Sequence, residues 1–219
     1  MENTKVRFMF LKKHPILKDI LSLICFIGCV IAGTLLLNTY VFRSYNVVGQ
    51  SMENTLHNDD RVIVNRLTVS WSHFKGEEYV PKRGEIIVFV NGEASGPLTC
   101  EAQKDVTDQY IIKRVIAFPG ERVVVKDGVM TVYNEEHPDG FIYDEEWRVG
   151  ENDEEGPKKN TSNEVDVTVP EGELFVSGDN REGSYSFDSR YEAFGTIPYC
   201  RVIGPVTLRL WPLNKLKIF

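Results

Sequence analysis

The chain has 219 residues, of which 42% are hydrophobic and 11% aromatic, so disordered, collagen-like and disulfide-scaffold classes are excluded. Its formal net charge of −7 argues against nucleic acid as a main partner. The charge is unevenly distributed: residues 1–42 hold five basic and two acidic side chains, a net +3, whereas the rest hold 20 basic and 30 acidic ones, a net −10. This asymmetry predicts that the two parts face different surroundings.

An apolar segment without charged residues covers residues 20–42. A helix needs about 20 apolar residues to cross the hydrocarbon core of a bilayer, so the segment is long enough. A cleaved secretory signal has only about 7–15 apolar residues before a small-residue cleavage site, whereas bulky Tyr40 and Phe42 end this segment. A buried helix of a soluble domain is disfavoured because the segment has no polar face. We predict an uncleaved transmembrane helix over residues 20–42.

The orientation of this helix follows from the basic residues around it. Those that precede it are Lys5, Arg7, Lys12, Lys13 and Lys18, and only Arg43 follows closely. Under the positive-inside rule, residues 1–19 stay in the cytoplasm and residues 43–219 form an extracytoplasmic domain. The prediction is a single-pass cell-membrane protein, with the lipid bilayer as one partner.

The part after the helix reads as mostly β. Short β-rich runs recur over residues 45–48, 61–64, 85–90, 110–116, 121–125, 129–133, 165–169, 174–176 and 206–210. Turn-forming residues separate them, and Asp127-Gly128 between two valine-rich runs predicts a tight hairpin. No long stretch after residue 42 keeps a helical period. We therefore expect a mostly β domain.

Two polar stretches, residues 91–108 and 134–164, read as variable loops. The second holds 11 acidic and three basic residues. Such a run is typical of a solvated surface, and it lacks the D-x-D-x-D-G pattern of a calcium loop.

The four cysteines predict no metal site. Cys25 and Cys29 lie in the apolar segment at helical spacing and read as small apolar residues. Cys100 and Cys200 could pair outside the cytoplasm, but the sequence does not show whether they are close. There is no C-x-x-C motif and the four histidines are scattered, so we expect neither metal nor cofactor.

Two segments contain residues suited to nucleophilic catalysis. Ser51 follows a predicted strand and lies near Gly49, which permits close backbone approach, although a serine in such a place is usually part of a turn. Lys113 lies inside an apolar strand, on one face with Ile111 and Val115. A lysine acts as a general base only when neutral, and desolvation lowers the lysine pKa. The alternative is an edge-strand lysine that reaches water.

A third segment is dense in Gly, Asp, Asn and Ser. It contains G-D-N-R over residues 178–181 and S-x-D-S-R over residues 186–190. Such residues favour a loop held by its own side-chain hydrogen bonds, and a loop of this kind can orient a catalytic amine.

Together the three segments resemble bacterial type I signal peptidase, a membrane-anchored endopeptidase with a Ser–Lys dyad. The resemblance covers the anchor and the motifs S-M-x-x-T-L, Y-x-x-K-R-x-x-x-x-P-G-E, G-D-N-R, S-x-D-S-R and L-W-P-L, in this order. It implies a β-barrel or β-sheet catalytic domain with a small inserted β subdomain over about residues 127–170. The single anchor resembles the Gram-positive type.

The resemblance also implies roles at matching positions. Ser51 is expected to be the nucleophile, and Lys113 the general base that later protonates the leaving amine. Ser186 is expected to orient the lysine amine. Ser184 competes for this role because the loop is two residues longer than usual, but S-x-D-S-R stays in register with Ser186.

Other positions are expected to support the site. Asp179 resembles the residue that pairs with Arg114, and Asp188 and Arg190 are expected to hold the loop. The residues expected to contact or shape the bound substrate are Gly49, Gln50 and Met52.

The Ser51 N–H is expected to donate to the oxyanion, a contribution of about 2.7–4 kcal/mol per donor in other hydrolases. Gly49 stands where some members have a serine that completes the oxyanion hole, so a different second donor is required here.

The function implied is cleavage of N-terminal signal peptides from secreted preproteins, after small residues at −1 and −3. Two alternatives stay open: a specialised peptidase with few substrates, and a non-catalytic, membrane-anchored relative that only binds preproteins. A self-cleaving repressor shares the Ser–Lys β-fold but would need a DNA-binding domain in place of the apolar segment.

Overall fold

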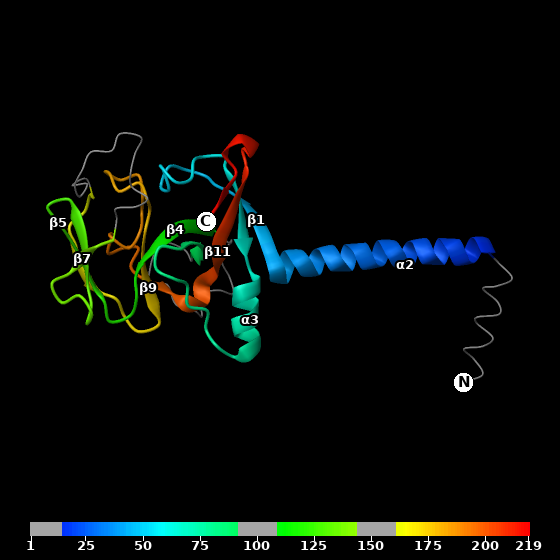
Figure 1. Ribbon diagram of the computed structural model, residues 1–219, viewed down its shortest axis with the longest axis horizontal. Helices are drawn as coiled ribbons and strands as arrows, with labels where there is room; N and C mark the ends of the chain where they lie inside the picture. The colour runs from blue at the N-terminus through cyan, green and yellow to red at the C-terminus, as the bar shows by residue number, and fades with distance from the viewer. Residues whose placement is uncertain (1–14, 92–108, 144–160) are drawn as a thin grey trace. The chain divides into compact units, whose positions relative to one another are not determined.

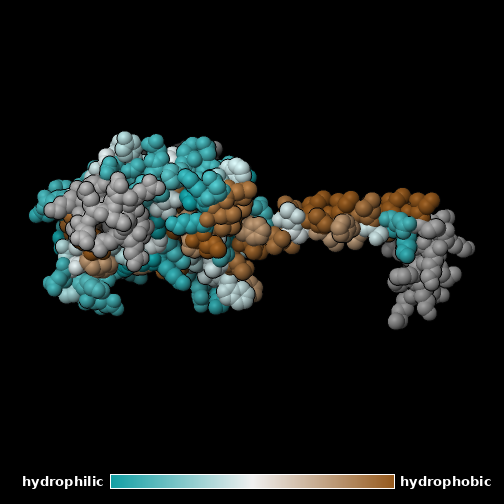
Figure 2. Space-filling model, turned by 45° about the horizontal axis from the view of Figure 1, so that its top comes forward, coloured by the Kyte–Doolittle hydropathy of each residue, from teal (hydrophilic) through white to brown (hydrophobic). Residues whose placement is uncertain are grey.

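The computed structural model describes residues 15–91, 109–143 and 161–219, and the chain divides into two compact units, Met1–Val41 and Phe42–Phe219 (Figure 1). The first contains helix α2 (Pro15–Leu36), which continues as the wider helical turn η1 (Leu37–Val41). The helical segment Ile16–Val41 contains an 18-residue stretch with a mean hydropathy of 2.7, and the segment is long and apolar enough to cross a membrane. Apolar residues cover most of helix α2 (Figure 2).

The helical segment differs from its predicted bounds of 20–42. It begins earlier and includes Lys18 and Asp19, because charged side chains are tolerated near a helix end, where they can reach water. It ends at Val41, and Phe42 already belongs to the first strand.

The second unit contains a large sheet of eight strands in the order β1–β2–β11–β3–β4–β9–β10, with β12 paired to β11. Neighbouring strands are antiparallel throughout. The strands are β1 (Phe42–Asn46), β2 (Arg61–Asn65), β3 (Ile86–Asn91), β4 (Gln109–Ala117), β9 (Glu173–Ser177), β10 (Ile197–Pro198), β11 (Val202–Trp211) and β12 (Lys217–Ile218).

A smaller antiparallel sheet is inserted between β4 and β9, in the order β7–β6–β5–β8. Its strands are β5 (Arg122–Lys126), β6 (Val129–Tyr133), β7 (Phe141–Ile142) and β8 (Val165–Thr168). It begins a few residues before the expected boundary at residue 127. The predicted Asp127-Gly128 turn joins β5 to β6, with Asp127 at φ 51° and Gly128 at φ 79°.

Three apolar clusters hold these sheets together. One contains Ile87, Phe89 and Val115 from the centre of the large sheet. The second packs on Ile86 and Val88 and buries Met52 and Leu56 from the segment that follows β1. The third lies under the small sheet. Of these residues of β3, the odd-numbered ones therefore pack in the first cluster and the even-numbered ones in the second, as expected for a strand buried on both faces.

The mostly β fold with one N-terminal apolar helix is confirmed, but short elements were missed. Helix α3 (Leu67–Lys75) buries only Val69, so it has no apolar stripe that a periodic pattern could detect. It ends at Gly76, at φ 75°, where the chain reverses. The two-residue strands β7, β10 and β12 are too short to show alternation.

Parts of the predicted loops 91–108 and 134–164 lie outside the described residues, as does Cys100. Cys200 lies in the short helix η3 (Tyr199–Arg201) and is disulfide-bonded, whereas Cys25 and Cys29 are free.

Candidate active site

Ser51 lies in a closed loop between β1 and β2, which we call the Ser51 loop (residues 47–60). Val47 and Asp60 close it: the Val47 N–H donates to the Asp60 carbonyl at 2.8 Å, and the Asp59 N–H donates to the Val47 carbonyl at 2.9 Å. Gly49 turns the chain with φ +95°, a conformation that disfavours other residues, and its N–H donates to Asn58 Oδ1 at 2.9 Å. These bonds hold both ends of the segment that carries Ser51.

The residues directly after Ser51 form a helical turn. The N–H groups of Thr55 and Leu56 both donate to the Met52 carbonyl at 2.8 Å. Met52 and Leu56 are fully buried in the second core, whereas Ser51 stays partly exposed. The buried side chains of Met52 and Leu56 thus fix the turn in the core, and the Ser51 hydroxyl stays on its accessible side.

Lys113 brings its amine to this hydroxyl from β4. It pairs with Ile87 of β3, and β9 joins β4 only from Arg114 onward, so Lys113 lies where the sheet edge opens. The Lys113 ammonium donates to Ser51 Oγ at 2.7 Å. The lysine is buried, which excludes the edge-strand alternative in which it reaches water.

Burial lowers the pKa of Lys113 from 10.5 to about 8. Asp188 and Asp179 raise this pKa again and Arg190 lowers it, so desolvation is the dominant cause. A fraction of the amine is therefore neutral near neutral pH. A neutral amine 2.7 Å from a hydroxyl can accept its proton, which is what an attacking serine requires.

Asp188 is the centre of the polar network behind the lysine. Its carboxylate is fully buried and accepts hydrogen bonds from Ser186 Oγ at 2.6 Å, the Gly178 N–H at 2.9 Å and two nitrogens of the Arg190 guanidinium at 2.8 and 2.9 Å. Burial alone would raise the pKa of Asp188, but these donors, above all Arg190, hold it below its usual value. Asp188 thus stays charged and fixes the loop.

The two candidate orienting serines have different environments. Ser186 is fully buried and donates to Asp188, whereas Ser184 is exposed. Ser186 also lies so close to Gly178 that a Cβ on this glycine would collide with its Oγ and with the carbonyl oxygen of Ser51. The structure therefore places Ser186, and not Ser184, beside the Ser51 loop.

Arg114 and Asp179 form a buried ion pair on the other face of β4. The guanidinium is bidentate on the carboxylate, at 2.8 and 2.5 Å. It also donates to the Gly84 carbonyl at 2.7 Å and to Thr55 Oγ1 at 3.4 Å. The pair expected from the sequence thus links the G-D-N-R loop to the Ser51 loop.

Asn180 had no role assigned from the sequence, yet it binds the Ser51 loop directly. Its N–H donates to the Ser51 carbonyl at 3.0 Å, and its Nδ2 donates to the Gln50 carbonyl at 3.2 Å. Its place in the G-D-N-R motif was the one available signal.

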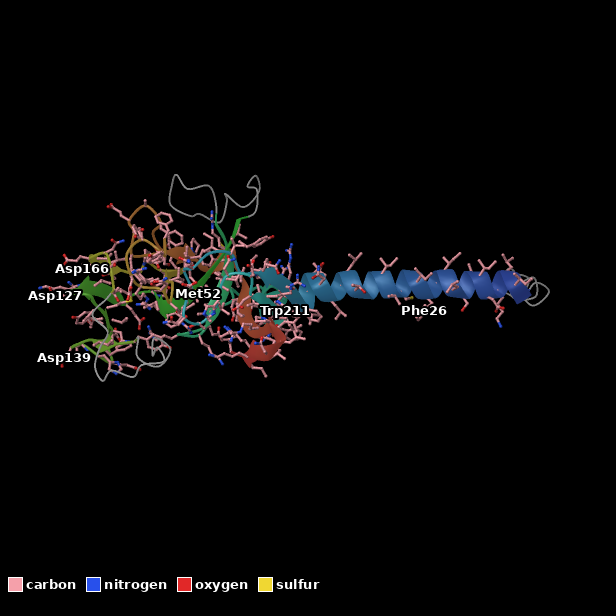
Figure 3. All side chains as sticks on the ribbon, turned by 90° about the horizontal axis from the view of Figure 1, so that it is seen from above. Phe26, Met52, Asp127, Asp139, Asp166 and Trp211 are labelled. Carbon is pink, nitrogen blue, oxygen red and sulfur yellow. The ribbon has the colours of Figure 1, made fainter. Side chains whose placement is uncertain are left out.

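A cleft of about 360 Å³ opens at Ser51 and Lys113. The segment Tyr45–Ser51 forms one wall and Tyr110–Lys113 of β4 the other, with Tyr185 and Phe187 beside them. Gly49 and Gln50, which the sequence predicts to contact substrate, line the cleft. Met52 does not line it, and supports its wall from the core below. Figure 3 shows Met52 in the interior of the Phe42–Phe219 unit.

Three exposed acidic side chains of the small sheet do not line this cleft. Asp127, Asp139 and Asp166 point outward from the small sheet (Figure 3), and all three are exposed. Over residues 15–91, 109–143 and 161–219, no three His, Cys, Asp or Glu side chains come close enough together to hold a metal ion.

Comparisons with known proteins point to one family. A family model described as signal peptidase, peptidase S26, matches residues 18–211. A signal peptidase I from Leptolyngbya laminosa is 32% identical over 193 residues, which are 87% of this chain and 79% of that protein. A signal peptidase IB from Staphylococcus aureus is 29% identical over 211 residues, 91% of this chain and 94% of that protein. A crystal structure of a signal peptidase I from Enterococcus faecalis is 27% identical, with a TM-score of 0.40, and covers 60% of this chain and all of that one.

Proposed function

Since the chain belongs to the signal peptidase family, peptidase S26, we propose that it cleaves signal peptides from preproteins with Ser51 as nucleophile and Lys113 as general base. Membership of the family supports signal-peptide cleavage by a serine peptidase. The observation that supports the two residue roles is the 2.7 Å contact between the Lys113 amine and Ser51 Oγ.

In the first half of the reaction the neutral Lys113 amine accepts the Ser51 hydroxyl proton while Oγ attacks the scissile carbonyl carbon. The Ser51 N–H supplies one donor to the developing oxyanion. Gly49 offers no side chain for a second donor, and its N–H is engaged by Asn58. The lysine then gives its proton to the leaving amine, which departs as the new N-terminus of the mature protein.

The second half regenerates the enzyme. The signal peptide is now esterified to Ser51, and Lys113 is neutral again. A water molecule attacks the ester carbonyl while Lys113 accepts its proton, and this proton returns to Ser51 Oγ as the ester breaks. One buried amine thus serves as base and acid in both halves.

The cleft suits an extended peptide. Among the described strands, β9 pairs with β4 only from Arg114 onward, so β9 does not cover the main chain of Ile111–Lys113 on the cleft side. An unpaired edge can bind a peptide by main-chain hydrogen bonds. The lining of the cleft is partly apolar, and by resemblance we expect the residues at −1 and −3 to be small.

We also propose that the apolar helix anchors the enzyme with the Phe42–Phe219 unit outside the cytoplasm. The net positive charge of residues 1–42 supports this orientation. A tethered enzyme and a membrane-bound preprotein share one surface, which raises their effective concentration.

The test uses the full-length protein in detergent micelles with a preprotein that has small residues at −1 and −3. Ser51→Ala and Lys113→Ala should each abolish cleavage. Lys113→Arg should fail too, because a guanidinium does not lose its proton at workable pH. Mass spectrometry of the products locates the cleaved bond.

Two exposed residues provide matched controls: Ser44→Ala and Lys126→Ala should keep full activity. Full activity of Ser51→Ala or Lys113→Ala would contradict the dyad. Binding of the preprotein without cleavage by the wild type would support the non-catalytic alternative, and cleavage of only a few preproteins in a panel would support the specialised one.

A further inference from the structure

Two aromatic side chains stand beside Ser51 and Lys113 without a part in the proposed chemistry. Tyr185 and Phe187 line the cleft, and they are 60% and 45% exposed. Large exposed aromatic side chains in a cleft are the usual anchors for a peptide ligand. They belong to the segment between the G-D-N-R and S-x-D-S-R motifs.

The local backbone fixes both aromatic residues. Exposure alternates along the segment, since Ser186 and Asp188 are fully buried between and after them. The buried pair is joined by the 2.6 Å hydrogen bond from Ser186 Oγ to Asp188. Tyr185 and Phe187 are exposed on either side of the fully buried Ser186. The two aromatic residues are therefore presented beside a buried polar network.

Phe187 is also held by neighbouring rings. Its centroid lies 5.2 Å from that of Tyr191 and 5.2 Å from that of Phe194, the latter in an edge-to-face arrangement. Tyr185 has more of its surface free and forms the more exposed part of the wall. A pre-positioned ring loses little conformational entropy when a peptide binds.

The position of the pair in the cleft indicates which part of the peptide it meets. The rings of Tyr45 and Tyr110 lie 4.9 Å apart at one end of the β4 segment that lines the cleft, and Ser51 and Lys113 meet at its other end. In the proposed function the residues before the cleaved bond pair with this segment of β4, so the residues after the bond lie beyond Ser51 and Lys113. Tyr185 and Phe187 flank Ser186, which lies beside Gly178 and the Ser51 carbonyl.

We propose that Tyr185 and Phe187 bind the first two residues after the cleaved bond and favour apolar or aromatic side chains there. The inference rests on the proposed function, because it assigns a specificity to the same site. Contact with an aromatic face removes apolar surface of the substrate from water, and about 50 Å² of such surface corresponds to a roughly five- to tenfold preference.

The experiment uses the full-length enzyme in micelles and preprotein-derived peptides that differ at one position. The residue at +1 or +2 is Ala, Leu or Phe, and a second series varies position −2 in the same way. We expect wild-type kcat/KM to be about five- to tenfold higher for Leu or Phe than for Ala at +1 or +2. Tyr185→Ala should bring this ratio close to one, and Tyr185→Phe should restore it.

Phe74→Ala is the matched control, because Phe74 is an exposed aromatic residue of α3 that does not line the cleft. It should keep both the rates and the ratio. A wild-type ratio near one, a ratio that Tyr185→Ala leaves unchanged, or a loss confined to position −2 would overturn the proposal. Failure of the wild type to cleave any peptide would instead contradict the proposed function, and this inference with it.

Discussion

Lys113 combines two properties that conflict in most proteins: its amine is buried and it must accept a proton. Burial makes the second property possible, because it removes the water that would solvate the charged amine and so lowers the lysine pKa to about 8. Three charged residues modulate this effect, with Asp188 and Asp179 raising the pKa and Arg190 lowering it.

The first prediction concerns the pH dependence of cleavage. Because the base must be neutral, kcat/KM should rise about tenfold per pH unit below pH 8 and level off above it. Initial rates of cleavage of a short peptide between pH 6 and pH 10 measure this rise in kcat/KM. A rate that is constant from pH 6 to pH 9 would argue against Lys113 as the base.

The second prediction concerns stability. Below pH 8 the amine is charged in the folded and unfolded states, so folding must desolvate a charge, at a cost of about 3 kcal/mol. Between pH 8 and pH 10.5 the unfolded state binds more protons, so this cost disappears as the pH rises. Lys113→Met should therefore be inactive yet more stable at pH 7, by about 2–3 kcal/mol.

Thermal unfolding in micelles at pH 7 and pH 10 checks this sign: the gain in Tm from Lys113→Met should shrink at the higher pH. A gain that grows with pH would contradict a lowered lysine pKa.

Gly178 is required for space and not for backbone freedom. A Cβ at this position would collide with the Ser51 carbonyl and with Ser186 Oγ. Gly178→Ala should therefore shift the Ser51 loop and reduce kcat about a hundredfold or more, since small displacements of reacting groups have effects of this size. Gly28→Ala is the control, because a Cβ there meets nothing within 4 Å. Equal kcat values for the two variants would contradict the close contact.

At the scale of elements, Arg209 of β11 holds the Ser51 loop through hydrogen bonds to two of its residues, a set of contacts that we call the Arg209 clamp. Arg209 of β11 donates to the Thr55 carbonyl at 3.0 Å and to Asp60 Oδ2 at 3.2 Å. The same carboxylate accepts the His57 N–H at 3.0 Å. The loop is thus held from three elements: β11, β4 through Arg114, and the segment that contains Asn180.

Removing this clamp should affect both stability and rate. Arg209→Met leaves the buried Asp60 carboxylate without its cation, a loss of about 3–5 kcal/mol for pairs of this kind. We expect a lower Tm and a kcat reduced about tenfold, with KM little changed, because substrate contacts the other side of the loop. Steady-state kinetics and thermal unfolding measure these effects.

Arg122→Ala provides the comparison, since Arg122 forms an exposed ion pair with Asp166 on the small sheet. It should change neither quantity, because exposed pairs contribute little. A clamp variant that behaves like Arg122→Ala would show that β11 does not position the loop.

At the scale of the whole molecule, charge and hydropathy divide the chain into two functional parts. The first contains one apolar helical segment and the second the complete polar network around Ser51. The basic residues that precede the apolar helix support the orientation proposed above, in which residues 1–19 are cytoplasmic and the second unit lies outside the cytoplasm.

Protease accessibility tests this orientation. In intact protoplasts, protease added outside should digest the Phe42–Phe219 unit and leave an N-terminal epitope tag protected. Replacing the basic residues of positions 5–18 with neutral ones, while adding lysines after Arg43, should reverse or mix the two orientations. Protection of the second unit in the unmodified protein would contradict the proposed topology.

Local patterns predicted much of this molecule. The apolar run, the alternating strands and the Asp127-Gly128 turn all depend on neighbouring residues, so they were visible in the sequence. Helix α3 was not, because it buries a single side chain. The motif order identified the family, which the comparisons confirm.

The sequence by itself therefore determined the apolar helix, the mostly β class and the motifs in which the candidate residues occur. Only the tertiary structure decided which of these residues meet. Ser51 and Lys113 are 62 positions apart, and their 2.7 Å contact depends on the register of β4 and the closure of the Ser51 loop. The lowered lysine pKa, the burial of Ser186 beside the Ser51 loop and the contacts from Arg209 likewise depend on burial and proximity. Both are properties of packed, distant segments that no local pattern contains.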